Sequence, residues 1–278
     1  MQLKKGVPAV QVVCLHAKDE IEALLRRNPF LHLYAIGDLD DFFWQYTSWY
    51  GCKEDDQIRH IVLLYSGTAV PTLLAYSEEP VELMSPFLRS MMHLLPKRVY
   101  AHLSPDLMPV IAEQYYVHTH GLHYKMALMQ PARLSSVDTS EVIPLAAADL
   151  DDLKALYQAS YPGNWFDPRM LETEHYFGIR RNGRLISVAG VHVYSRQYRV
   201  AALGNVTTHP AFRGQGLGTA VCARLCQVLL ESVDHIGLNV KADNLSALAS
   251  YQRLGFERVA MYEECLLDLK CDELSDER

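Results

Sequence analysis

The segment that most constrains the fold of this chain is a strand end followed by a glycine-rich loop at residues 206–218. It reads Val-Thr-Thr-His-Pro-Ala-Phe-Arg-Gly-Gln-Gly-Leu-Gly. Pro210 has no N–H to donate to a sheet ladder, so the preceding strand is expected to end beside it. The glycines let the backbone N–H groups turn inward together, and the first turn of the following helix leaves its own N–H groups unpaired. Such a loop binds an anion, and the guanidinium of Arg213 suits it to a pyrophosphate.

This loop differs from the two common nucleotide-binding loops. It lacks the Gly-Lys-Ser/Thr of a Walker loop, and it lacks the glycine directly after the strand that a dinucleotide fingerprint requires. Arg213, Gly216 and Gly218 instead resemble the Arg/Gln-x-x-Gly-x-Gly/Ala loop with which GNAT N-acetyltransferases bind acyl-coenzyme A. Because the pattern is short, an ordinary strand-to-helix turn is its alternative interpretation, and a second motif is needed.

The second motif is a short helix that begins near Asn244. Asn244 is a preferred N-cap residue, apolar side chains recur after it at helical spacing, and Gly255 suits the left-handed residue that ends a helix. The segment resembles the GNAT pattern Asn-x-x-Ala-x-x-x-Tyr-x-x-Leu-Gly-Phe, matched by Asn244, Ala247, Tyr251, Leu254, Gly255 and Phe256. Both motifs stand in the order expected for that family, so the C-terminal half is identified as a member of the GNAT superfamily.

A boundary between two halves is expected at residues 131–141, which are polar, contain a proline and lack apolar periodicity. It separates an expected domain over residues 1–131 from an expected catalytic domain over residues 141–278. In the second domain the patterns predict strands over 142–145, 176–181, 185–194, 199–207, 235–241 and 258–269. They predict helices over 150–159 and 167–174, after the glycine loop, and around Tyr251, with an Asn182-Gly183 hairpin turn. This is the GNAT order, which implies an α/β (α+β) fold with a mixed, mostly antiparallel central sheet flanked by helices.

The N-terminal half repeats that order more weakly. Its patterns predict strands over 12–15, 58–65, 70–76, 99–102 and 123–129, and helices over 20–27, 31–43, 81–95 and 106–116. No glycine loop follows the segment 70–76, where Ser77-Glu78-Glu79-Pro80 stands instead, and two carboxylates would repel a pyrophosphate. We interpret this half as a degenerate second GNAT-like copy that walls off the acceptor site or the domain interface. An unrelated α/β cap is the alternative.

The resemblance implies an acyl-coenzyme A co-substrate, most simply acetyl-CoA, and a set of site residues. Backbone groups at Val206 and Thr208 are expected to bind the pantetheine and the acyl carbonyl. The remaining expected cofactor-binding residues are Arg213, Gly214, Gln215, Gly216, Leu217, Gly218, Thr219, Asn244 and Ala247. Tyr251 matches the family's general acid, which protonates the departing thiolate, although a packed core tyrosine is the alternative reading.

The general base is open at this stage. Many family members carry a glutamate on the strand that enters the loop, and residues 199–207 contain none. His192 on the adjacent strand is one candidate because histidine titrates near neutral pH, and a water chain to solvent is the other. The segment 161–166 lies where the family binds its acceptor. Its aromatic residues either contact an acceptor with apolar surface or anchor the loop to the core.

Composition and charge limit the classes of partner and the compartment that we expect for this protein. A formal net charge of −7 and a pI near 5.9 argue against a nucleic-acid or membrane partner. No membrane span or signal peptide is recognisable, and the six cysteines show no zinc-binding spacing. We therefore expect a cytoplasmic N-acyltransferase without a metal, monomeric or homodimeric, that acts on a small-molecule or peptide amine. The alternative is a coenzyme A sensor or scaffold without turnover. The acceptor and the acyl chain length are not specified by these patterns.

Overall fold

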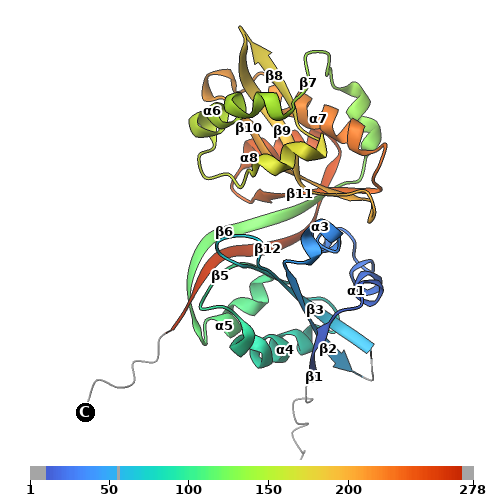
Figure 1. Cartoon of the computed structure of the whole chain (residues 1–278), viewed down its shortest axis with the longest axis vertical. Coiled ribbons are helices and arrows are strands. Elements are labelled where there is room, and N and C mark those ends of the chain that lie inside the picture. The colour runs from blue at the N-terminus through green and yellow to red at the C-terminus, as the bar shows by residue number, and fades with distance from the viewer. Residues whose placement is uncertain (1–10, 55–56, 271–278) are drawn as a thin grey trace, which may run out of the picture. The chain divides into compact units, whose positions relative to one another are not determined.

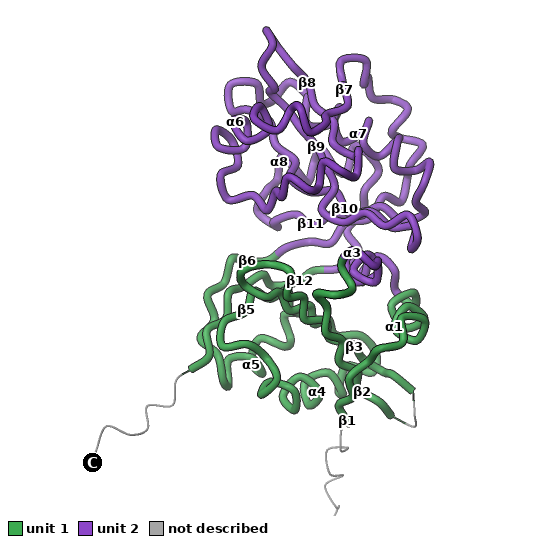
Figure 2. The backbone as a smooth tube through the Cα atoms, in the orientation of Figure 1, with its two compact units in different colours: residues 1–27, 43–122, 261–278 green, residues 28–42, 123–260 purple. Residues whose placement is uncertain are grey.

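The computed structural model describes residues 11–54 and 57–270. Their strands form one mixed, mostly antiparallel sheet of twelve strands in the order β1-β2-β3-β4-β5-β12-β6-β11-β10-β9-β8-β7 (Figure 1). The chain divides into two compact units (Figure 2). Unit 1 holds residues 43–122 and the flanking segments up to residue 27 and from residue 261, and unit 2 holds residues 28–42 and 123–260. The predicted fold class is confirmed.

Unit 2 contains the elements expected for the C-terminal half. They are β7 (Ile143–Pro144), α6 (Leu150–Ser160), η6 (Pro168–Thr173), β8 (Phe177–Arg181), β9 (Arg184–Ser195), β10 (Val200–Thr208), α7 (Leu217–Leu229), β11 (His235–Lys241) and α8 (Leu245–Arg253). Asn182 and Gly183 both have positive φ, as a two-residue hairpin turn between β8 and β9 requires. The segment expected as a helix over 167–174 is a 3-10 helix, capped by the Asp167 side chain.

Unit 1 departs more from the sequence-based expectation. Its elements are β1 (Gln11–Leu15), α1 (Lys18–Leu25), β2 (Thr47–Glu54), β3 (Gln57–Tyr65), β4 (Thr72–Ala75), α4 (Met84–Met91), β5 (Arg98–Leu103) and α5 (Met108–Ile111). Strand β2 was not predicted, although its Thr, Trp and Tyr residues favour strands. Between α1 and β2, where residues 28–42 belong to unit 2, the single helix predicted over 31–43 is replaced by two short ones, α2 (Leu33–Gly37) and α3 (Asp41–Trp44). The Asp40 side chain accepts the Phe42 N–H and starts the new turn.

The last strand of each half runs into the other unit. In β6 (Tyr115–Leu128), residues 123–127 pair with β11, and in β12 (Phe256–Leu269), residues 263–268 pair with β5. The strand predicted over 258–269 therefore does not simply close the sheet of its own half. The segments 1–131 and 141–278, suggested as domains, also exchange pieces, since residues 28–42 and 123–130 belong to unit 2. Strand alternation specifies which face is buried, but it does not specify the neighbouring strand.

Each unit has its own apolar core. In unit 2, side chains of α6, α7 and α8 pack on β8 to β11, and in unit 1, α4 and α5 pack on strands that include β12. Among the helices of the described residues, none is both long and apolar enough to cross a membrane. Within residues 11–54 and 57–270, no three His, Cys, Asp or Glu side chains are grouped so as to hold a metal ion. The described cysteines are unbridged, and Cys271 lies outside the described residues.

Candidate functional site

The two parallel strands β10 and β11 separate halfway along their length. They pair from Val200 with His235 to Leu203 with Leu238, although β10 continues to Thr208 and β11 to Lys241. We call this separation the strand opening; it is bounded by residues 204–208 of β10 and 239–241 of β11. Because the ladder ends there, backbone groups on the inner edges of the opening have no strand partner. Those that no side chain binds are available to a ligand that enters between the strands.

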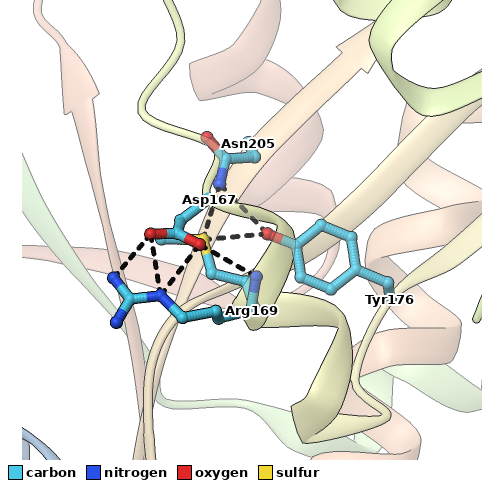
Figure 3. Close-up of polar contacts among 5 residues, drawn as sticks. Asp167, Arg169, Tyr176 and Asn205 are labelled. Atoms are coloured by element: carbon cyan, nitrogen blue, oxygen red, sulfur yellow. Dashed lines mark hydrogen bonds and ion pairs between the residues drawn. The ribbon is translucent and has the colours of Figure 1, made fainter. Parts of the chain in front are cut away.

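The second half of β10 is held away from β11 by other contacts. Asn205 has a left-handed backbone with φ of 54°, and the register of β10 with β9 shifts between Gly204 and Thr207. The buried hydroxyl of Tyr157 on α6 donates to the Asn205 carbonyl at 3.0 Å. The Asn205 amide donates to the Tyr176 hydroxyl at 3.0 Å (Figure 3). Asn205 therefore forms a bulge in β10. Hydrogen bonds from α6 and to Tyr176 hold this bulge in place, whereas β11 does not pair with it.

The sequence patterns did not point to Asn205, Tyr157 and Tyr176 as residues that shape the site. The available signal was an asparagine inside an apolar strand, because Asn is unfavourable in strands and is enriched among residues with positive φ. Thr207 also ties β10 to α6, since its hydroxyl donates to the Ser160 hydroxyl at 3.1 Å. The C-terminal turn of α6 thus contacts the separated half of β10 at two positions.

The glycine loop has the backbone that an anion site needs. Gly214 and Gly216 have φ of 78° and 79°, and no atom lies within 4 Å of the position where either would carry a Cβ. A Cβ on Gly218 would meet only the Thr208 hydroxyl oxygen, at 3.4 Å. In the described part of the chain, the first backbone N–H after Arg213 with an acceptor is that of Ala220, which donates to the Gly216 carbonyl at 3.0 Å. Consecutive N–H groups at residues 214–219 therefore remain for a ligand.

Arg213 is placed differently from the simple expectation of a cation that points at the pyrophosphate. Its Nε donates to the Thr208 carbonyl at 3.1 Å and its Nη2 to the Ser160 carbonyl at 3.4 Å. The guanidinium therefore ties the loop to β10 and to α6. Its side chain is also exposed, so the positive charge still contributes to the potential at the loop.

Tyr251 lies on α8, which begins as predicted. The Asn244 side chain caps the helix by accepting the Ala247 N–H at 3.2 Å. Tyr251 is 9% exposed, and its hydroxyl has no hydrogen-bond partner among the described residues. Burial, followed by the neighbouring Cys222 thiol and Tyr34 hydroxyl, raises the pKa of Tyr251 well above its usual range. The phenol therefore keeps its proton and is free to donate it.

His192 lies beside the strand opening. It is the extra residue of a bulge in β9, since Ala202 pairs with Val193 and Leu203 with Val191. A Cβ on Gly204 would lie 2.3 Å from the His192 Nδ1 atom, so the ring rests on the residue at which β10 and β11 separate. The structure thus brings His192 to the opening, on the β10 side of it.

The loop over residues 161–166 divides its aromatic residues between two roles. Phe166 packs on Tyr157 and Tyr176, with ring centroids 5.2 and 5.6 Å apart. Tyr161 and Trp165 are 42% and 47% exposed. Phe166 therefore anchors the loop to the core, whereas Tyr161 and Trp165 offer surface to a ligand.

Unit 1 has no equivalent opening between β4 and β5. These parallel strands pair along the whole of β4, from Thr72 with Tyr100 to Ala75 with Leu103. Beyond the strand end, Ser104 N–H donates to the Ala75 carbonyl at 3.1 Å, and Ser77 N–H donates to the Ser104 hydroxyl at 2.9 Å. The place that corresponds to the strand opening of unit 2 is therefore closed by hydrogen bonds.

Comparison with known proteins identifies relatives of the C-terminal half. Residues 145–256 match the model of the acetyltransferase (GNAT) family. N-alpha-acetyltransferase RimI of Mycobacterium tuberculosis is 34% identical over 91 residues, which is 31% of this chain and 54% of that protein. The chain thus spans about half of the length of this curated relative.

Two solved structures resemble nearly the whole chain in fold. A Drosophila protein superposes with a TM-score of 0.68 at 14% identity, over 93% of this chain and 98% of that one. A tandem GNAT protein from the clavulanic acid biosynthesis pathway superposes with a TM-score of 0.54 at 13% identity, over 92% and 98% of the two chains. The whole chain thus has the fold of a tandem GNAT protein, and residues 145–256 of its C-terminal half carry the match to the GNAT acetyltransferase family.

Proposed function

We propose that this protein is an acyl-CoA-dependent N-acyltransferase that transfers an acetyl group from acetyl-CoA to a primary amine by direct attack in a ternary complex. The observation that carries the proposal is the end of the β10 to β11 ladder at Leu203 and Leu238, directly before the glycine loop and the N-terminus of α7. The compartment is proposed to be the cytoplasm.

The proposed binding mode assigns one part of coenzyme A to each part of the site. The pyrophosphate would accept hydrogen bonds from the backbone N–H groups of residues 214–219, with the positive end of α7 behind them. The pantetheine would replace the missing strand partner of β10 at Val206 and Thr208, and the same edge would hold the thioester carbonyl. Asn244 and Ala247 lie at the start of α8, where the small Ala247 side chain leaves room beside Tyr251.

The proposed chemistry needs no covalent intermediate on the protein. The amine nitrogen forms a bond to the thioester carbon, and the backbone N–H groups of β10 stabilise the negative charge that develops on the carbonyl oxygen. The carbon–sulfur bond then breaks, and the thiolate takes the proton of the Tyr251 hydroxyl. The nitrogen loses its proton to His192 or to water, and solvent returns a proton to Tyr251. The raised pKa of Tyr251 supports its assignment as the acid.

We propose a single coenzyme A site per chain, in unit 2. Unit 1 lacks a glycine loop after β4, and its β4 to β5 ladder is closed at Ala75 and Ser104.

The test combines calorimetric binding of coenzyme A with release of free thiol from acetyl-CoA. The acceptor panel contains tyramine, spermidine, free alanine and a peptide that begins with alanine, the last because the name of the mycobacterial relative specifies an α-amino acceptor. Thiol release that depends on an amine supports the enzyme. Tight binding without release for every amine would support the sensor or scaffold instead, and absence of binding would overturn both.

A further inference from the structure

Residues 28–42 precede the family-matched segment by about a hundred residues, yet they pack within unit 2 (Figure 2). Helix α2 lies on β9, β10 and β11. A Cβ on Gly37 would lie 2.0 Å from a Val193 methyl group, and the Leu33 side chain lies 3.0 Å from the Cβ position of Gly237. The Ser195 hydroxyl donates to the Asp40 carboxylate at 2.7 Å. This segment therefore covers one face of the sheet in which the strand opening lies.

Tyr34 of α2 reaches both sides of the strand opening. Its ring centroid is 6.5 Å from that of His192, which rests against Gly204 on the β10 side. The Lys125 ammonium lies 5.3 Å from the same Tyr34 ring, and Lys125 is the cross-strand partner of Asn239 on the β11 side. The Tyr34 hydroxyl also contributes to the raised pKa of Tyr251. One residue from the N-terminal half thus lies close to His192 on the β10 side and to Lys125 on β6, the strand next to β11.

Asn239 is the first residue of β11 beyond its pairing with β10. Its side chain shares a face with Lys125, because directly opposed residues of antiparallel strands point the same way. The Asn239 Oδ1 atom is buried and has no hydrogen-bond partner among the described residues. Buried acceptors are nearly always paired in folded proteins, so an orphan beside a ligand site indicates a donor supplied by the ligand.

On the basis of the proposed function, we propose that Asn239 and Tyr34 hold the acceptor as a neutral primary amine. Each side-chain oxygen accepts one of the two N–H groups of the amine. The lone pair on nitrogen is then directed at the thioester carbon. A protonated amine has no lone pair and could not attack that carbon. Lys125 is nearly fully buried, and burial lowers its pKa to about 7. The same burial disfavours a protonated acceptor amine beside it, and a protonated Lys125 would repel one.

The proposal is tested in the full chain with Asn239→Leu and Tyr34→Phe. Both variants should bind coenzyme A within about twofold of wild type, whereas kcat/KM for the amine should fall about 10-fold, the loss for one hydrogen bond of ordinary strength. Asn239→Leu removes an unpaired buried oxygen, so its melting temperature should rise or stay the same. A merely structural asparagine would lose stability and keep the KM for the amine. Tyr124→Phe, on the residue next to Lys125, is the matched control and should change neither binding nor kcat/KM.

A second readout compares each panel amine that turns over with its N-methyl derivative, for example tyramine with N-methyltyramine. Methylation removes one N–H, so it should reduce kcat/KM more in wild type than in Asn239→Leu or Tyr34→Phe. Equal reductions in all three proteins, or unchanged kcat/KM in both variants, would overturn the assignment and leave the proposed transferase intact. Coenzyme A binding without turnover of any amine would overturn the proposed function, and this assignment with it.

Discussion

Replacing Gly218 by alanine should weaken the binding of phosphate groups at the start of α7 without lowering the stability of the fold. The added Cβ would meet only the Thr208 hydroxyl oxygen at 3.4 Å, an ordinary contact, and Gly218 does not have positive φ. Alanine is favoured over glycine in helices by up to about 1 kcal/mol, so the free energy of unfolding should stay constant or rise. If a phosphate oxygen sits on this helix end, the methyl group displaces it. Loss of one hydrogen bond to a charged group is worth about 1.5–3 kcal/mol, which weakens coenzyme A binding about 10- to 100-fold.

Urea unfolding gives the stability of this variant, and calorimetric titration gives its affinity for coenzyme A. Gly163→Ala is the matched control, because no atom lies within 4 Å of its Cβ position and its φ is not positive. It should leave the affinity unchanged. If Gly218→Ala bound coenzyme A as tightly as wild type while keeping its stability, the phosphate groups would not lie at this helix end, and the proposed binding mode would be refuted.

Four further predictions concern catalysis, stoichiometry, stability and pH. Tyr251→Phe should keep coenzyme A affinity and lower kcat by about 10²–10⁴-fold, the usual range for a positioned acid; a wild-type kcat in steady-state assays would exclude that role. Calorimetry should saturate at one coenzyme A per chain, and a stoichiometry of two would contradict the closed β4 to β5 ladder. Tyr157→Phe leaves the buried Asn205 carbonyl without its donor and should lower the free energy of unfolding by about 1–3 kcal/mol, with weaker coenzyme A binding; a fully stable variant would show that the bulge does not depend on α6. Burial raises the pKa of Asp38 from its usual 3.8 to about 7, so between these pH values the native state holds a proton that the unfolded state has released. The free energy of unfolding therefore falls as pH rises through this range. Asp38→Asn should reduce the dependence of the free energy of unfolding on pH by up to about 1.4 kcal/mol per pH unit, measured by urea unfolding at several pH values. The same pH dependence in both proteins would contradict a buried, protonated Asp38.

Much of the candidate site could be predicted because its signals are local. A strand end at a proline, glycines with positive φ, and an asparagine N-cap are decided by the backbone of a few consecutive residues. The glycine loop, the helix that carries Tyr251 and the order of elements in the C-terminal half therefore follow from the sequence. The anchoring of the bulge by Tyr157 and Tyr176 does not, since neither hydroxyl is near Asn205 along the chain.

The sequence by itself determined the order of elements in the C-terminal half and the position of the glycine loop, because both rest on periodicity and turn chemistry within short segments. The resemblance of its two motifs to those of GNAT proteins implied the fold class. Only the tertiary structure decided which strands are neighbours and which segment covers the opening. The residues 116–123 of β6 are mostly exposed or half-buried, so hydrophobic alternation says little about their pairing. Residues 28–42 lie in the first half of the sequence and pack in unit 2, because contacts between distant segments depend on matched surfaces such as Gly37 on Val193, and no local pattern encodes both sides of such a contact.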